Sequence, residues 1–333
     1  METRVTVNRS HTVNDMHPCY ELDKTYYVFS KNPSIRCVVL YVFLGLLSVV
    51  TICGNLLVII SIIYFKQLHT STNYLILSLA VADLLVGVLV FPLSMAFTVT
   101  ACLYHEGLFC KIRTSFDIVL STASILNLCC ISIDRYYAIC QPLTYKSKIT
   151  NQIIGFMILM SWGTAALICL GVMFSGCIQG QCEQSFLIDA LISTILPCIF
   201  SFYIPVITML SIYLKILLVA KRQANSIQNT ICQNRNSGIT VSKMERKATK
   251  TLAIVMGVFL LCWTPYFVCI IFQPLISDIT PIPVIETLNW LTLFNSMLNP
   301  FIYAFFYSWF RSAFRIIISG KILQGDFSNS KLL

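Results

Sequence analysis

The sequence is poor in charge, because only 11% of its 333 residues are Asp, Glu, Lys or Arg, whereas 57% are hydrophobic. Ordinary soluble domains carry roughly 25% charged residues. This shortage argues against a soluble globular protein and indicates a lipid environment.

Motifs of soluble enzyme chemistry are also missing. The sequence contains no HExxH, no CxxC pair with zinc spacing, no P-loop and no GxSxG. The four histidines, His11, His17, His69 and His105, all lie outside the long apolar segments. Their positions argue against a catalytic base inside an apolar core, and we expect no enzyme.

Long apolar segments are abundant instead. A hydrocarbon core about 30 Å thick takes roughly 20 helical residues to span. Seven segments qualify, at about 38–64, 73–97, 110–138, 152–174, 187–219, 249–272 and 284–307. We expect an all-α fold, a seven-transmembrane helix bundle. A transporter or channel is the competing class, but such folds show internal repeats, and the sequence has none.

The distribution of basic residues predicts the orientation in the membrane. Loops 98–109, 175–186 and 273–283 contain no Lys or Arg, whereas 215–250 alone contains eight. Basic loops face the cytoplasm, so the N-terminus is expected outside, in a multi-pass protein of the plasma membrane. The net charge of +9 is then a topology signal. No basic face with interleaved aromatics appears, so we expect no nucleic-acid partner.

Three regions follow from this topology. We expect an extracellular tail over 1–36, a seven-span domain over 37–307, and a short amphipathic eighth helix with a cytoplasmic tail over 308–333. No basic segment with a short apolar stretch and cleavage site follows Met1. We therefore expect no cleavable signal peptide, with the first span as the insertion signal.

The outer face carries candidates for covalent modification. Five of the fifteen cysteines fall at extracellular or boundary positions, where disulfides can form: Cys19, Cys102, Cys110, Cys177 and Cys182. A bond from Cys110 to the loop holding Cys177 and Cys182 would pin that loop over the bundle. Asn8 opens a glycosylation sequon, Asn-Arg-Ser, on the expected outer tail.

The third expected span carries two carboxylates, one in its outer part and one at its inner end. Asp117 and Asp134 lie 17 positions apart, which is about 25 Å along a helix. A carboxylate in hydrocarbon is costly, so Asp117 must face the bundle or water. Ser121, Ser124 and Ile125 share its helical face, which indicates that this face points inward.

A second polar set lies deeper in the expected bundle. Its members are oxygen-bearing or amide side chains in four spans: Asp83, Asn55, Ser124, Asn295, Ser296 and Asn299. Such a cluster suits a hard monovalent cation such as Na⁺, or a purely structural hydrogen-bond network. The sequence leaves both open and indicates no other metal or cofactor. Separately, Pro205, Pro265 and Pro300 are expected to kink their helices.

Motifs along the chain resemble those of rhodopsin-class G-protein-coupled receptors. They are Gly54-Asn55, LAVAD, the DRY of 134–136, Trp162, Pro205 with Tyr213, CWTP at 262–265 and NPFIY at 299–303. The resemblance covers about 38–318. FKQLHTSTNYLI, ERKATKTL and NSMLNPFIYAFFYSWF at 295–310 resemble, more narrowly, the vertebrate trace amine-associated receptors, particularly of fish type.

This resemblance implies an amine-activated olfactory receptor that raises cyclic AMP through a stimulatory-type heterotrimeric G protein. Asp117 would pair with the ligand ammonium in a charge-assisted hydrogen bond. The implied ligand-binding residues are Asp117, Phe116, Ser121, Ser201, Trp263, Tyr266, Phe267 and Trp290. The implied disulfides are Cys110–Cys182 and Cys19–Cys177. The alternative is a receptor of the same fold for a non-amine ligand, with Asp117 structural.

The sequence departs from the family pattern at two points near Asp117. Many amine receptors have a tyrosine that hydrogen-bonds this aspartate, where this chain has Leu293. Some fish members have a second aspartate for diamines, where this chain has Pro197. Glu183 could replace it, and the alternative is that Glu183 is a solvated loop charge. What holds the Asp117 carboxylate is therefore an open question.

An activation switch is expected at the inner face. In the resting state Arg135 would pair with Asp134 and with Glu245 of the sixth helix. On activation the sixth helix would swing about Pro265. Opening of the inner face would admit a G-protein helix into a groove. The remaining members of the expected switch are Tyr136, Tyr213, Ile125, Pro205, Phe259, Pro300 and Tyr303.

Overall fold

The computed structural model describes residues 20–23, 26–29, 35–100, 108–178, 194–231, 238–272, 282–323, 327–329 and 332. The long helices are α1 (Ile35–Tyr64), α2 (Ser71–Leu85), α3 (Phe91–Thr100), α4 (Leu108–Cys140), α6 (Asn151–Ile178), α9 (Ile204–Ile231), α10 (Gly238–Phe272) and α11 (Ile282–Phe306). The shorter ones are η2 (Lys66–Leu68), η3 (Val86–Val90), α5 (Pro142–Lys148), α8 (Leu196–Cys198), η7 (Ile199–Tyr203), α12 (Ser308–Ile318) and η9 (Lys321–Leu323).

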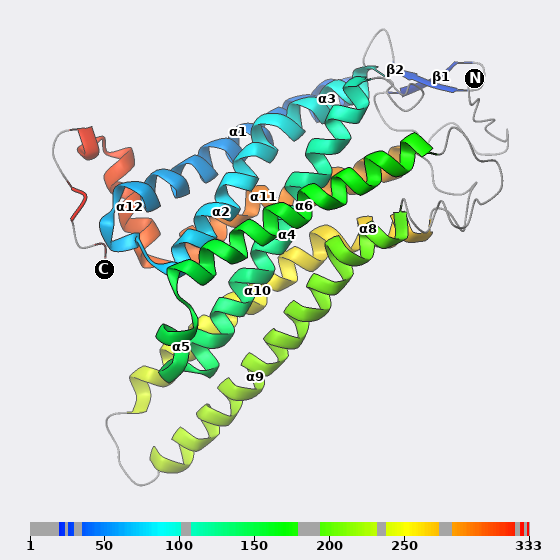
Figure 1. Cartoon of the computed structure of the whole chain (residues 1–333). Coiled ribbons are helices and arrows are strands. Elements are labelled where there is room, and N and C mark those ends of the chain that lie inside the picture. Colours follow the sequence, from blue (N-terminus) through cyan, green and yellow to red (C-terminus); the bar gives the residue numbers. More distant parts are fainter. Residues whose placement is uncertain are drawn as a thin grey trace.

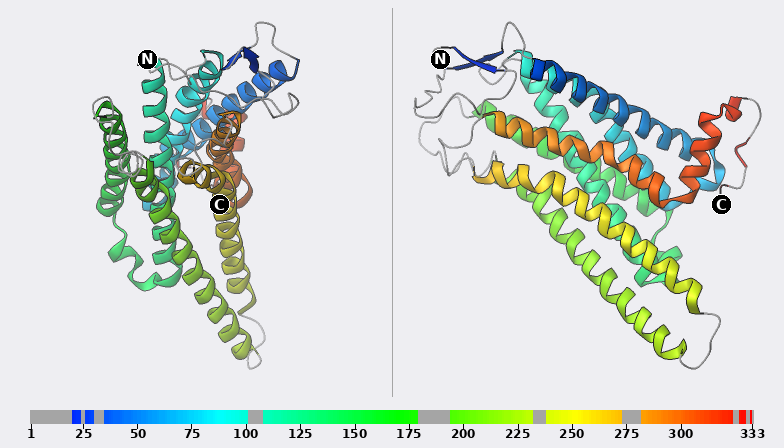
Figure 2. Two further views of the ribbon diagram at one scale, coloured as in Figure 1. Left: turned by 90° about the vertical axis from the view of Figure 1, so that its right-hand side faces the viewer. Right: turned by 180° about the vertical axis from the view of Figure 1, so that it is seen from behind.

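The long helices run side by side in an elongated bundle (Figure 1). The N-terminal strands β1 and β2 lie at one end, called here the hairpin end. Helices α5 and α12 lie at the other, called here the α12 end. Seen from behind, α9 and α10 project past the other helices at the α12 end (Figure 2). Helix α4 is central, because it packs against α2, α6 and α9.

Six of the seven expected spans are confirmed as helices long and apolar enough to cross a membrane. They are Val38–Tyr64, Ser71–Met95, Lys111–Cys140, Asn151–Phe174, Leu196–Val219 and Ile254–Phe272. The seventh corresponds to α11, which has 25 residues but carries buried Asn289, Asn295 and Asn299. These amides lower its hydropathy. Helix α11 nevertheless packs between α1 and α10 and completes the bundle.

The outer surface of α1 illustrates why the bundle needs lipid. Val42, Leu46 and Val49 recur every three to four residues and are 59%, 59% and 56% exposed. Leu44 and Leu47 face the interior and are buried. An apolar row on the outside of a helix whose inner face is also apolar is typical of a membrane span.

The short amphipathic eighth helix expected from the sequence is α12. Phe310 is buried in a cluster with Ile62 and Ile76, and Ala313 is buried in one with Phe65 and Leu68. Arg315 is exposed. The helix thus lies with its apolar face against the α12 end of the bundle.

A β-hairpin in the N-terminal tail was not expected. Strands β1 (Tyr20–Asp23) and β2 (Tyr26–Phe29) pair antiparallel, with Tyr20 opposite Phe29. The all-α fold class is confirmed by the bundle, to which this short hairpin is a small addition. The segment is rich in Tyr, Val and Phe, which favour strands, and that signal was available in the sequence.

The expected proline sites differ in their local structure. Pro265 and Pro300 lie inside α10 and α11, as predicted. Pro205 is the second residue of α9 and follows the π-helical segment η7. Because proline has no N–H, it cannot bond back to Ser201 in η7. Such π-helical turns often occur at functional sites.

Candidate functional site

A cavity of about 220 Å³ lies among α4, α6, the start of the fifth span, α10 and α11. Six of the eight predicted ligand-binding residues line it: Asp117, Ser121, Ser201, Trp263, Tyr266 and Phe267. The structure therefore brings together side chains from three helices that are far apart in the sequence. Because drug-sized ligands occupy roughly 300–1,000 Å³, the volume favours a small ligand.

The other two predicted residues do not line this cavity. Phe116 is 39% exposed and lies next to Asp117 on α4, roughly 100° around the helix. Trp290 packs against Phe91, with ring centroids 5.8 Å apart. Its neighbour Asn289 lines the cavity instead, so α11 presents a different face from the one predicted.

The Asp117 carboxylate has two partners on its own helix. Ser121 donates a hydrogen bond from Oγ to Oδ1 over 3.3 Å. One turn nearer the hairpin end, Arg113 places Nη2 3.8 Å from Oδ2. Leu293 is 2% exposed and packs in an apolar cluster with Trp290. Ser121 and Arg113, both on α4, are therefore the residues that restrain this carboxylate, in place of a tyrosine at position 293.

The apolar base of the cavity is built from aromatic rings. Phe267 stacks on Phe202, with centroids 4.2 Å apart and planes 5° from parallel. Trp263 is 3% exposed, and its Nε1 has no hydrogen-bond partner among the described residues. Such rings can pack an apolar ligand body or attract a cation to their faces.

The sequence reasoning missed several residues of this site. Arg113 is the main one, although its i,i+4 spacing from Asp117 was a readable signal for an ion pair. Thr122 and Thr292 also line the cavity. Nothing in a single sequence distinguishes such hydroxyls from others in the spans.

Asp83 forms the centre of the second predicted set. It is fully buried and accepts hydrogen bonds from Ser124 Oγ over 3.1 Å and from Asn299 Nδ2 over 2.6 Å. Asn55 Nδ2 donates to the Ser296 carbonyl over 3.1 Å. Asn55 Oδ1 and Asn295 Nδ2 are buried without a partner among the described residues. The bonds of Asp83 with Ser124 and Asn299, and the bond of Asn55 with Ser296, therefore join five of the six predicted residues, from four spans, in two groups.

Asp134 is held by three donors at the α12 end of α4. Its side chain is 0% exposed and lies 3.0 Å from Arg135 Nη2. Thr72 Oγ1 and the Tyr145 hydroxyl each donate to it over 2.8 Å. The Asp134–Arg135 pairing thus has the geometry expected from the sequence. The anchors from α2 and α5 were not foreseen.

The remaining expected switch residues lie along the interior. The Tyr213 hydroxyl is 3.0 Å from Ser132 Oγ. Ile125, Phe259 and Tyr303 are buried at 1%, 1% and 7% exposure. Tyr136 lies with its ring 6.0 Å from Lys215 Nζ. These residues line the route from the cavity to the α12 end.

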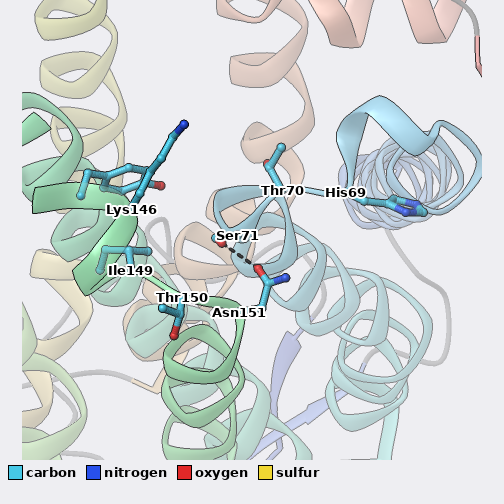
Figure 3. A pocket seen from close by; sticks show the side chains of 8 residues that line it. His69, Thr70, Ser71, Lys146, Ile149, Thr150 and Asn151 are labelled. Atoms are coloured by element: carbon cyan, nitrogen blue, oxygen red, sulfur yellow. Dashed lines mark hydrogen bonds between the residues drawn. The ribbon is translucent and has the colours of Figure 1, made fainter. Parts of the chain in front are cut away.

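A second cavity, of about 400 Å³, opens at the α12 end where α2, α5 and α6 meet (Figure 3). Ser71 donates a hydrogen bond to Asn151 Oδ1 over 2.8 Å, which joins the first turns of α2 and α6. Tyr145, which bonds Asp134, also lines this cavity. The cavity is thus adjacent to the Asp134 anchor.

Several predicted residues lie outside the described part of the chain. They are Asn8, Cys19, Cys182 and Glu183, together with the side chains of Cys110, Cys177 and Glu245. Both disulfides, the glycosylation site and the Arg135–Glu245 pair therefore stay predictions. Among the described residues, no group of three or more His, Cys, Asp or Glu could hold a metal ion.

The family described as 7 transmembrane receptor (rhodopsin family) matches residues 54–303. The chain belongs to this family of G-protein-coupled receptors, which are receptors and not enzymes. It is 46% identical to trace amine-associated receptor 1 of Macaca mulatta over 312 residues, covering 88% of this chain and 91% of that one. It is 43% identical to trace amine-associated receptor 9 of Homo sapiens over 309 residues, covering 88% of each. Human trace amine-associated receptor 2 is 42% identical, with 89% and 86% covered. These identities place the chain among the trace amine-associated receptors.

Proposed function

We propose that this receptor binds a small amine at Asp117, serves in olfaction and raises cyclic AMP through a stimulatory-type G protein. One observation carries the proposal. Asp117 is the only charged residue among the described residues that line the 220 Å³ cavity. An ammonium there would gain a charge-assisted hydrogen bond, while Trp263 and Phe267 pack its apolar body. The names of the similar receptors support an amine ligand.

The orientation belongs to the same proposal. The segment 215–250 contains eight basic residues, and its described parts, 215–231 in α9 and 238–250 in α10, lie toward the α12 end, where these helices project (Figure 1). By the positive-inside rule this end is cytoplasmic. The hairpin end is then extracellular at the plasma membrane, so the cavity lies in the outer half and receives its ligand from outside.

A sodium ion fits the chemistry of the Asp83 network. Carboxylate and hydroxyl oxygens, which Asp83 and Ser124 supply, are the donors that hard cations prefer. The buried Asn55 Oδ1, which has no hydrogen-bond partner in the described part of the chain, adds an oxygen nearby. Asp83, Ser124 and Asn55 with Asn295, Ser296 and Asn299 would hold the ion or its water shell. Its charge would offset that of the buried carboxylate.

Activation would move the α12 end. A ligand pressing on Trp263 would swing α10 about Pro265 and repack Ile125 and Phe259 against the Pro205 segment. Pairing of Arg135 with Asp134 and Glu245 opposes this motion in the resting state. Tyr213 and Tyr303 would turn inward, and a G-protein helix would enter the groove. Ligand and G protein then favour the same state, so each strengthens binding of the other.

The test is a cyclic-AMP reporter assay on cells expressing the full-length receptor and exposed to volatile mono- and diamines. We expect at least one amine to activate the receptor. Asp117→Asn should raise the half-effective concentration by about tenfold to a hundredfold, as expected for loss of a hydrogen bond to a charged group.

Ser115→Ala is the matched control on the same helix. The Ser115 hydroxyl bonds the Lys111 carbonyl of α4 over 2.7 Å and does not line the cavity. The Asp117–Arg113 ion pair favours the competing function, a non-amine ligand with Asp117 structural. An amine response that survives Asp117→Asn at equal surface expression would establish that alternative.

A further inference from the structure

Asp117 faces a cation of its own chain. Arg113 Nη2 lies 3.8 Å from Asp117 Oδ2, and the two side chains are 15% and 14% exposed. The Arg113 guanidinium also donates to Ser94 Oγ on α3, over 3.4 Å from Nε and 3.3 Å from Nη2. Because Ser94 is buried, at 3% exposure, Arg113 is held between α3 and α4 beside the carboxylate.

The length of this ion pair leaves the carboxylate oxygen available. A hydrogen bond between a nitrogen and an oxygen spans about 2.7–3.2 Å, so at 3.8 Å the guanidinium attracts Oδ2 without being hydrogen-bonded to it. The other oxygen accepts from Ser121 over 3.3 Å, which is also long. A ligand group can therefore approach Asp117 without first breaking a tight contact.

The charge balance of the pair restricts the ligand. Arg113 places a fixed positive charge 3.8 Å from the carboxylate, so a ligand carrying only an ammonium brings a second positive charge close to the guanidinium. Like charges at a largely buried site repel strongly, because water screens them poorly. A ligand with an acidic group beside its ammonium adds no net charge. Its acidic group can meet Arg113, whose planar guanidinium suits a carboxylate.

We infer that the preferred ligands are small zwitterionic amines of the α-amino-acid type. The ammonium binds Asp117, the carboxylate binds Arg113, and an apolar side chain packs toward Trp263 and Phe267. Arg113 is then the residue that determines specificity between amino acids and simple amines. This inference rests on the proposed function, since it takes Asp117 as the ammonium site.

The test compares matched ligands on purified full-length receptor in detergent. The probes are three pairs, alanine, leucine and phenylalanine, each against its amide, which keeps the ammonium and shape but lacks the acidic group. Binding is titrated by the ligand-dependent rise in melting temperature, which needs no G protein. At least one amino acid should bind about tenfold to a hundredfold more tightly than its amide, as a charged hydrogen bond implies.

Arg113→Gln should remove this preference by weakening the amino acid at least about tenfold, while the amide binds as well as before or better. Arg113→Lys should keep part of the preference, because the charge remains. Lys111→Gln is the matched control, since it removes one positive charge from an exposed position of the same helix. It should leave the preference intact.

The outcomes separate the two proposals. If amides bind as well as amino acids, or if Arg113→Gln weakens both alike, the zwitterion inference fails. The amine receptor still stands if Asp117→Asn weakens amide binding by about tenfold or more. If no probe or simple amine binds and Asp117→Asn changes nothing, the proposed function fails and the inference with it. If Arg113→Gln does not fold, either of two other results overturns the inference. One is that folded Lys111→Gln loses the preference for the amino acid over its amide. The other is that Arg113→Lys shows no such preference at all.

Discussion

Asn299 on α11 donates a hydrogen bond of 2.6 Å from Nδ2 to Oδ2 of Asp83 on α2, across 216 positions of sequence. Oδ1 of the same carboxylate accepts from Ser124 on α4 over 3.1 Å. One buried side chain thus ties three helices together at the middle of the bundle. A buried carboxylate is costly unless its charge is offset, which is the physical argument for a cation at this site.

Asp83→Asn should make ligand affinity independent of sodium. The asparagine keeps the size of the side chain and an oxygen for Asn299, but it lacks the charge that attracts the ion. Affinity for an active ligand is measured in sodium chloride and in N-methyl-D-glucamine chloride at equal ionic strength. The wild type should differ between the two salts by several-fold and the variant should not.

Ser61→Ala serves as the control for this experiment. Ser61 is buried, and its hydroxyl bonds the Leu57 carbonyl within α1 over 2.7 Å. Its sodium response should match the wild type. A wild-type receptor with equal affinity in both salts would mean that the Asp83 network is structural only.

Gly54→Ala should destabilise the receptor. A Cβ at Gly54 would lie 3.0 Å from Cβ and Cγ of Pro300, a rigid ring on α11. Overpacking of this kind costs typically about 1–3 kcal/mol. Gly45→Ala on the same helix meets nothing within 4 Å, so it should leave the melting temperature unchanged or raise it. Thermal denaturation in detergent compares the two, and equal melting temperatures would show that α1 and α11 are not so closely packed.

Tyr145→Phe should also lower the stability. The variant loses the 2.8 Å hydrogen bond to Asp134, and a bond to a charged group is worth about 1.5–3 kcal/mol. Burial and the neighbouring Asp134 raise the pKa of Tyr145 above its usual range, although the Thr72 contact opposes this. The hydroxyl is therefore a donor at neutral pH.

Tyr136→Phe is the control for Tyr145→Phe. The phenylalanine ring retains the contact with Lys215, whose Nζ lies 6.0 Å from the ring centroid. We expect a change below about 0.5 kcal/mol, as for substitutions away from special features. Thermal denaturation at neutral pH checks both variants, and equal losses would argue against a specific role for the Tyr145 bond.

The features that the sequence could predict are those that depend on length and on helical period. Apolar length predicted the spans, because a membrane core has a fixed thickness. The period of α4 correctly placed Asp117 and Ser121 on one inward face. Asp83 and its polar partners could be grouped because each is costly in lipid and must find the others.

The rotation of each helix about its own axis could not be predicted in the same way. Asn289 lines the cavity and Trp290 does not. Helix α11 is therefore rotated so that it turns residue 289 toward the cavity, where residue 290 was expected. Such rotation depends on packing against neighbouring helices, here the Phe91–Trp290 contact. The π-helical segments η3 and η7 shift the register of their spans for the same kind of reason, since tertiary packing overrides local propensity.

Phe202→Ala should be the most destabilising single change in the cavity base. Phe202 is 2% exposed, stacks on Phe267 at 4.2 Å and lies 6.2 Å from Phe259. In a membrane the loss arises from the cavity and the lost van der Waals contacts rather than from water transfer. Truncation of a buried phenylalanine costs about 3–5 kcal/mol in soluble proteins, so we expect a value toward the lower end.

Phe202→Leu keeps most of the side-chain volume, so it should lose less than half as much stability in thermal denaturation. Phe200→Ala, at a position that is 54% exposed, is the control two residues earlier and should change the melting temperature little. If Phe200→Ala and Phe202→Ala melt alike, the aromatic stack is not what stabilises this part of the bundle.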